Sequence, residues 1–296
     1  MIDAQATSVG DRVRKRGLTA FLLMSFGVAW GWEAVARLLL GWSLVNLLVQ
    51  VPAAFAPAAA ALVVRRWVTR EGFADAGSRL RLRSAWRYYL LAWLGPLGVA
   101  VAVVGVAAAS GRWEPSVRPM ADLVPGVPVW SVPLLLCAVA PIVTVALWGE
   151  EFGWTGYLLL RICPGRPRRA ALAAGLIAAV WHYPLALFGY AEFRHLALGL
   201  VGWTAWIMCQ EVILAWLRAR SRSIWPACLA HAGNNFVLAP LTTALLLGPG
   251  GFGQEGIQLL VVLVLAALAA GPLVRAGRQE SREWAPSIGT SPGSGQ

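Results

Sequence analysis

Few residues inside the apolar stretches of this sequence can transfer a proton or bind a metal ion. Charged residues make up 13% of the chain, against 58% hydrophobic residues. The ionisable side chains within long apolar runs are few, and amides accompany them: Glu33, Glu150, Glu151, His182, Glu211 and His231, with Gln210, Asn234 and Asn235. Because an ionisable group is costly to place in an apolar medium, each of these residues is a candidate for function.

The types of these residues suit the hydrolysis of a peptide bond. That reaction requires a base that activates water and a group that holds the developing oxyanion. Glu150 and Glu151 are about 100° apart on a helix, so only one of them can point straight into a cavity. His231 and Asn235 are four residues apart, which places both on one helix face.

The surrounding sequence predicts helices that cross a membrane. A mean hydropathy of +0.63 and so few charges leave too little polar surface for a water-soluble domain, so most of the surface must face lipid. A spanning helix needs roughly 20 mostly apolar residues. We therefore predict an all-α, polytopic transmembrane bundle of about eight spans, near residues 18–40, 44–64, 87–109, 130–160, 169–190, 195–217, 223–247 and 256–275.

Charge in the connectors predicts the topology. The net charge is +11, and the basic residues gather in every second connector, as expected for segments on the cytoplasmic side. This distribution argues against nucleic acid as a partner. It predicts a basic cytoplasmic N-terminus over 1–17, a transmembrane bundle over 18–275 and a disordered cytoplasmic tail over 276–296. Both termini are then cytoplasmic, in a multi-pass protein of a prokaryotic cell membrane.

With this topology, the candidate residues lie at a common depth. Glu150, His182 and His231 belong to three different spans. Counting residues from the cytoplasmic ends places them roughly 12–20 Å deep, at 1.5 Å per residue. We therefore expect a glutamate, a histidine and a histidine–asparagine pair to meet in one layer of the membrane.

Three motifs of this sequence resemble those of a known family. They read GEEFGWTGYLLLR from Gly149 to Arg161, AAVWHYPLALF around His182, and SIWPACLAHAGNN around His231 and Asn235. In this order and spacing they are similar to the CPBP intramembrane proteases, the CAAX-processing and bacteriocin-processing (Abi) family. The resemblance covers a core of 149–235. It implies an intramembrane endopeptidase that acts on a membrane-embedded or lipid-modified protein or peptide.

The sequence departs from the family pattern at two positions. Thr155 stands where an arginine is frequent four residues after the second glutamate, and Ala178 replaces an aromatic residue. An arginine four residues after Glu151 would lie beside it on the helix, whereas Thr155 offers only a hydroxyl. We therefore expect Glu151 to be protonated or paired with another helix.

The resemblance implies catalytic roles for Glu150, Glu151, His182, His231 and Asn235, and two mechanisms stay open. In the first, Glu150, His182 and His231 bind a divalent ion, with Zn²⁺ favoured, and leave a position for water. In the second, Glu150 and His182 activate water without a metal, while His231 and Asn235 stabilise the oxyanion. Asparagine is a poor zinc ligand, which favours the oxyanion role for Asn235.

Two other classes of function remain as alternatives. A non-catalytic relative could bind a peptide or lipid in the same cavity, and a proton-coupled transporter also uses buried carboxylates and histidines. We interpret the remaining polar residues of the spans as structural. These are Gln210, Glu211 and Asn234, whose expected partners are neighbouring helices, and Glu33, which we expect to be structural or near the membrane interface.

Overall fold

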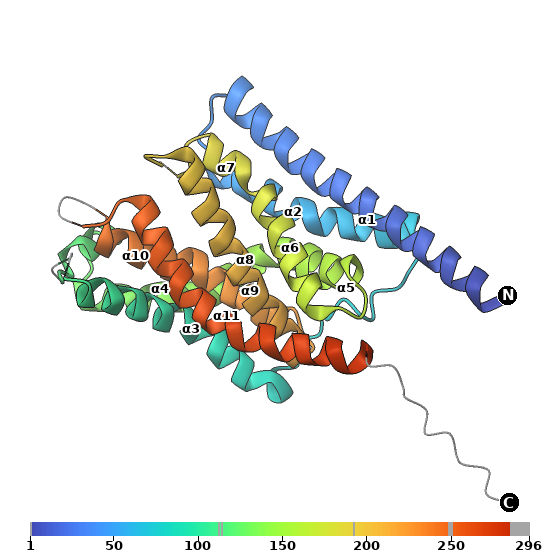
Figure 1. Cartoon of the computed structure of the whole chain (residues 1–296). Coiled ribbons are helices and arrows are strands. Elements are labelled where there is room, and N and C mark those ends of the chain that lie inside the picture. Colours follow the sequence, from blue (N-terminus) through green and yellow to red (C-terminus); the bar gives the residue numbers. More distant parts are fainter. Residues whose placement is uncertain (1, 112, 114, 192, 248–250, 285–296) are drawn as a thin grey trace, which may run out of the picture.

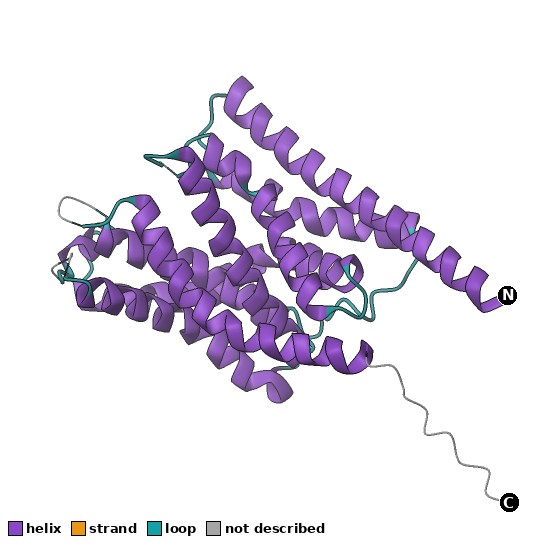
Figure 2. Cartoon of the chain, in the orientation of Figure 1, coloured by secondary structure: helices purple, strands orange, loops and turns teal. Residues whose placement is uncertain are grey.

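The computed structural model describes residues 2–111, 113, 115–191, 193–247 and 251–284. Over these residues the chain forms helices and no strand, apart from an isolated bridge between Leu247 and Phe252 (Figures 1 and 2). The N-terminal end of α1 and the C-terminal end of α11 lie at the same end of the bundle (Figure 1). The prediction of an all-α, polytopic bundle is confirmed.

The elements are helices joined by short connectors. The α-helices are α1 (Ile2–Ala34), α2 (Leu47–Val63), α3 (Leu82–Ala109), α4 (Val132–Gly153), α5 (Leu159–Ile162), α6 (Pro167–Trp181), α7 (Tyr183–Leu187), α8 (Leu196–Ser221), α9 (Trp225–Gly233), α10 (Ala239–Leu246) and α11 (Gln254–Trp284). Short 3₁₀ turns are η3 (Arg118–Asp122) and η4 (Val129–Ser131). Wider π-helical turns are η1 (Val35–Leu39), η2 (Val64–Val68), η5 (Trp154–Leu158) and η6 (Asn234–Leu238).

Within the described residues, six helical segments are long and apolar enough to cross a membrane: 10–39, 47–68, 82–109, 129–162, 196–221 and 254–278. Two of the eight predicted spans are not among them. Their segments, 169–190 and 223–247, are instead built from α6 with α7 and from α9, η6 and α10. These are the segments that carry His182, His231 and Asn235. The number of spans and the side on which the termini lie stay predictions.

The predicted span over 169–190 is interrupted by a proline, Pro184. Pro184 has no N–H to donate and its ring clashes with the preceding helical turn. Helix α6 therefore ends at Trp181, and α7 begins at Tyr183. His182 lies between them, at the C-cap of α6.

Helix α9 is the interior helix of the bundle. Every residue from Pro226 to Gly233 is buried, and the helix packs against α3, α4 and α8. Such a helix is apolar on every side because every side faces protein. Glycine allows its closest approach: a Cβ added at Gly233 would lie 2.5 Å from Cγ of Pro96 on α3.

Helices α2 and α4 also meet at glycines. A Cβ at Gly149 would lie 2.7 Å from the carbonyl oxygen of Ala54, and one at Gly153 would lie 2.4 Å from Cβ of Pro57. Neither separation is possible for a real side chain. The glycines on either side of the glutamate pair thus set how closely α4 packs on α2.

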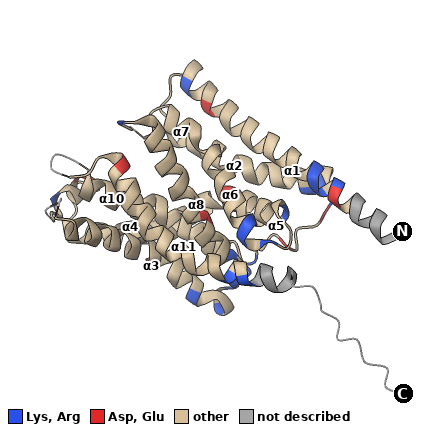
Figure 3. Cartoon of the chain, viewed as in Figure 1, with Lys and Arg blue, Asp and Glu red and all other residues tan. Residues whose placement is uncertain are grey.

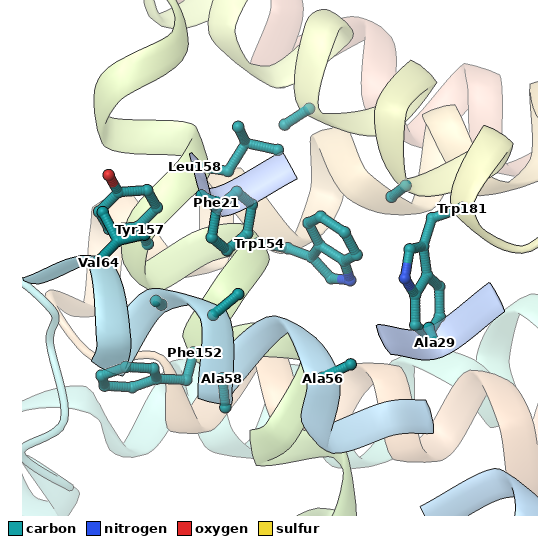
Figure 4. Packing of buried hydrophobic residues seen from close by; sticks show 14 of the residues in the cluster. Phe21, Ala29, Ala56, Ala58, Val64, Phe152, Trp154, Tyr157, Leu158 and Trp181 are labelled. Atoms are coloured by element: carbon teal, nitrogen blue, oxygen red, sulfur yellow. The ribbon is translucent and has the colours of Figure 1, made fainter. Parts of the chain in front are cut away.

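A cluster of buried aromatic side chains joins α1 to α4 and α6 (Figure 4). The rings of Phe21 and Trp154 are 5.8 Å apart, and those of Trp154 and Trp181 are 5.6 Å apart. The Trp181 indole N–H donates to the Ser25 carbonyl, while Trp30 donates to the carbonyl of Trp181 itself. These bonds satisfy polar groups at the end of α6 and fix the backbone next to His182.

Lysine and arginine gather at the end of the bundle where the described chain begins and ends (Figure 3). Arg65 lies there with no exposed surface and donates to Asp75 Oδ1 (2.7 Å) and to the carbonyls of Gly72 and Gly156. Arg161 donates to the other Asp75 oxygen at 2.9 Å. The connector between η2 and α3 is thereby fastened to the end of the α4 segment.

The first part of the predicted disordered tail, 276–284, is drawn as a continuation of α11. Helix α11 continues without a break to Trp284, although the sequence there is charged. The rest of the predicted tail, 285–296, lies outside the described residues. The start of the chain is helical as well, since α1 begins at Ile2 within the segment predicted as a basic N-terminus.

Candidate functional site

Glu150 lies on the wall of a cavity of about 770 Å³ inside the bundle. Its side chain is buried, and its Oε2 atom is 3.6 Å from His182 Nε2 and 4.0 Å from His231 Nε2. The three residues come from α4, from the junction of α6 with α7, and from α9. The structure thus brings together the three residues that the sequence placed at one depth.

His182 is oriented by the backbone of its own helix. Its Nδ1 atom lies 2.8 Å from the carbonyl oxygen of Ala178, which can only accept a hydrogen bond. We therefore assign the proton to Nδ1, which leaves the Nε2 lone pair directed at Glu150. The Trp181 ring packs edge-on against the imidazole at 4.7 Å and restricts its rotation.

Glu151 contacts His231 and does not line the cavity. Its Oε1 atom lies 2.8 Å from His231 Nδ1, and both side chains are buried. Thr155 donates its hydroxyl to the backbone carbonyl of Glu151, not to the carboxylate. Without an arginine at position 155, we expected Glu151 to be either protonated or paired with another helix. In the structure it is paired with His231 of α9. As with His182, the contact at Nδ1 leaves His231 Nε2 facing Glu150.

Asn234 and Asn235 both line the cavity, from the first turn of η6. Asn234 is buried and Asn235 is exposed. A π-helical turn inside an α-helix is often found at functional sites, because it redirects side chains that a regular helix would space evenly. Here two consecutive amides lie about one turn beyond His231. Asn234, which we expected to serve helix packing, thus lines the cavity as Asn235 does.

Comparison with protein families gives a match over the region that contains these residues. The family model described as type II CAAX prenyl endopeptidase Rce1-like matches residues 128–237. This part of the chain is therefore similar to the Rce1-like family. The match contains all five predicted site residues, from Glu150 to Asn235. No curated protein matches the chain.

Two carboxyl groups that sequence reasoning treated as structural also line the cavity. Glu33 lies on α1, outside the Rce1-like segment, and Glu211 lies on α8, inside it. Both are 3% exposed, and Glu33 Oε2 has no hydrogen-bond partner within the described part of the chain. The cost of an ionisable group in an apolar medium had marked both as candidates, but nothing in the sequence placed them beside Glu150.

The residues of the site include side chains that can bind a metal ion. One carboxylate and two histidines are the donor types of catalytic zinc sites. Glu150 Oε2 is buried without a hydrogen-bond partner among the described residues, and both histidines have Nδ1 fixed by a second group. Over the same residues, however, no three acidic, histidine or cysteine side chains lie at the spacing of metal ligands. The residue types fit a metal ion, and an ion would require the side chains to draw closer together.

Proposed function

We propose that this protein is an intramembrane endopeptidase that hydrolyses a peptide bond in a membrane-associated or lipid-modified polypeptide. One observation carries the proposal: inside the cavity, the Nε2 atoms of His182 and His231 both face a single buried oxygen of Glu150. These residues fall within the segment that matches a family described as prenyl endopeptidases, which supports peptide hydrolysis as the class of reaction.

In this proposal Glu150 and His182 activate a water molecule. Their facing atoms are 3.6 Å apart, too far for a strong direct hydrogen bond and close enough for one water to contact both. As the water oxygen bonds to the substrate carbonyl carbon, its proton passes to this pair. The pair then protonates the leaving amide nitrogen as the carbon–nitrogen bond breaks.

His231 and Asn235 would hold the negative charge that develops on the carbonyl oxygen. Asn235 offers amide N–H groups, and a doubly protonated His231 donates from Nε2. The carboxylate of Glu151, 2.8 Å from Nδ1, supplies the opposite charge for that form of His231. Glu151 is thus a positioning residue, because it acts on the reaction through His231.

A divalent ion such as Zn²⁺ is the second form of the proposal. Glu150, His182 and His231 would hold it, and when bound it would act as a Lewis acid that activates water. The hydrogen bonds at Nδ1 of each histidine are of the kind that orient metal-binding imidazoles. Since Asn235 is a poor ligand, its oxyanion role is the same in both forms.

The test is cleavage of membrane-anchored and prenyl-mimetic peptides by the full chain in lipid. We expect Glu150→Gln and His182→Ala to lower kcat by about 10²- to 10⁴-fold, the usual contribution of general acid–base groups. Thr144→Val is the matched control, since it removes another buried polar group from α4 whose hydroxyl bonds only to its own helix. Folding is monitored by the thermal midpoint of each variant.

Cleavage by Glu150→Gln within twofold of wild type would overturn the proposal and favour the non-catalytic binding alternative. A chelator distinguishes the two forms. Loss of cleavage with a chelator and recovery with Zn²⁺ would select the metal form, and unchanged cleavage would select the metal-free one. Metal content of the purified protein, compared with that of His182→Ala, gives a readout that does not depend on activity.

A further inference from the structure

The cavity is closed at the arginine-rich end of the bundle. The connector between η2 and α3 crosses this end, and Ile224 and Trp225 at the start of α9 donate to the carbonyls of Gly77 and Ser78. None of these residues lines the cavity, and neither do Arg65 and Asp75, which fasten the connector from the other side. A substrate therefore has no described route to Glu150 from this end.

The cavity opens at the opposite end. Its wall there comes from the connector before α2, from the residues before α8, and from the junction of α10 with α11. Exposure rises in this direction: Glu150 is 6% and His231 3% exposed, whereas Val45 is 63% and Leu247 48% exposed. We call this end the mouth, lined by Val45, Tyr190, Arg194, Leu247, Gln254 and Glu255.

Charge assigns the two ends to the two sides of the membrane. Basic residues within connectors are strongly enriched on the cytoplasmic side. Here they gather at the closed end (Figure 3), while the mouth has Arg194 together with Glu255. The closed end is therefore the cytoplasmic one, and the mouth faces the other side of the membrane.

The wall between the mouth and Glu150 suits a polypeptide. It includes the amide side chains Gln50, Gln210 and Gln258, and Gln258 Oε1 is buried without a hydrogen-bond partner in the described part of the chain. Amides pair with the N–H and C=O groups of an extended peptide backbone, whereas the apolar chain of a prenyl group would leave Gln258 Oε1 unpaired.

We infer that the site takes its substrate from the non-cytoplasmic face of the membrane, as an extended segment of a membrane-anchored polypeptide that enters through the mouth. The inference rests on the proposed peptidase function for the reaction itself. It narrows the substrate to polypeptides presented at the outer surface. A cytoplasmic protein with a prenylated C-terminus would meet the closed end instead.

The first experiment measures which face each end occupies. Single cysteines are introduced at the mouth, as Val45→Cys or Leu247→Cys, after Cys137, Cys163, Cys209 and Cys228 are replaced by alanine. Ser78→Cys is the matched control at the closed end, because Ser78 is exposed and its bond to Trp225 uses only the backbone carbonyl. A membrane-impermeant maleimide is added to intact cells and to permeabilised cells.

We expect both mouth cysteines to react in intact cells and Ser78→Cys to react only after permeabilisation. The reverse pattern, or equal reaction of both ends in intact cells, would overturn the inference. Two mouth positions are used so that one poorly folded variant does not decide the result. This labelling needs no substrate, so it tests the inference even where cleavage fails.

The second experiment asks whether the mouth is the entrance. Each single-cysteine protein, purified in lipid, is treated with a bulky maleimide, and cleavage of a membrane-anchored peptide is compared before and after treatment. We expect at least a tenfold loss for the mouth variants and less than a twofold change for Ser78→Cys. Full cleavage after complete labelling of the mouth would overturn the assignment of the mouth as the substrate entrance. Absence of cleavage before labelling would count against the peptidase function alone.

Discussion

Glu151 offers a sharp test of how the site is organised, because it is absent from the cavity wall and contacts the site only through His231. The perturbation is Glu151→Gln, which keeps the shape of the side chain and a hydrogen-bond acceptor 2.8 Å from His231 Nδ1 but removes the charge. Both side chains are buried, so solvent does not screen the interaction.

The size of the effect follows from the kind of bond that is lost. A hydrogen bond to a charged group contributes about 1.5–3 kcal/mol, and a neutral one about 0.5–1.5 kcal/mol. The difference of about 1–1.5 kcal/mol corresponds to a roughly 5- to 13-fold decrease in kcat, at 1.36 kcal/mol per factor of ten. Because Glu151 does not touch the cavity, KM should change less than twofold.

The assay is steady-state cleavage of a membrane-anchored peptide, with kcat and KM determined separately and the thermal midpoint measured for each protein. Glu71→Gln is the matched control, since Glu71 is another ion-paired glutamate but lies beside Arg161, away from the cavity. A loss as large as that of Glu150→Gln, or no loss in a folded protein, would refute the positioning role.

Two further predictions concern the packing that supports the site. Gly153→Ala should destabilise the protein by about 1–3 kcal/mol, because its Cβ would lie 2.4 Å from Pro57, while Gly27→Ala, with nothing within 4 Å, should not; thermal midpoints in one detergent decide this. Asp75→Ala should cost about 1–3 kcal/mol, since it removes a carboxylate partner of the buried Arg65. Partial burial raises the pKa of Asp75, but the hydrogen bond from Arg65 and nearby charges outweigh it and hold the pKa below its usual 3.8. The carboxylate thus stabilises the fold at all higher pH, so the difference in melting temperature from wild type should stay constant between about pH 8 and 5 and shrink only below 3.8. A difference that already shrinks at pH 6 would contradict this.

Sequence reasoning found the helical bundle and the residues that meet in it. Apolar runs separated by basic connectors specify spanning helices, because lipid contact and connector charge act on each segment locally. The same local rules predicted a common depth for Glu150, His182 and His231, and the structure places both histidine Nε2 atoms within 4.0 Å of Glu150 Oε2.

Sequence reasoning did less well where helices are interrupted or hidden. The segments around His182 and His231 were predicted as uninterrupted spans, whereas one breaks before Pro184 and the other widens into a π-helical turn. Helix α9 lies inside the bundle, where packing against other helices decides the backbone path and hydropathy does not. Helix α11 likewise continues beyond its apolar part, into the segment 276–284 that was predicted as the start of the tail.

By itself, the sequence indicated which residues can do chemistry and predicted that they lie at one depth, because residue type and distance along a helix are local properties. The pairing of Glu151 with His231, the entry of Glu33 and Glu211 into the cavity wall, and the end at which the cavity opens were decided by the tertiary structure. Each depends on how helices rotate and approach one another. Glycines such as Gly149 and Gly233 allow a close approach, but the residues that they approach are far away in the chain.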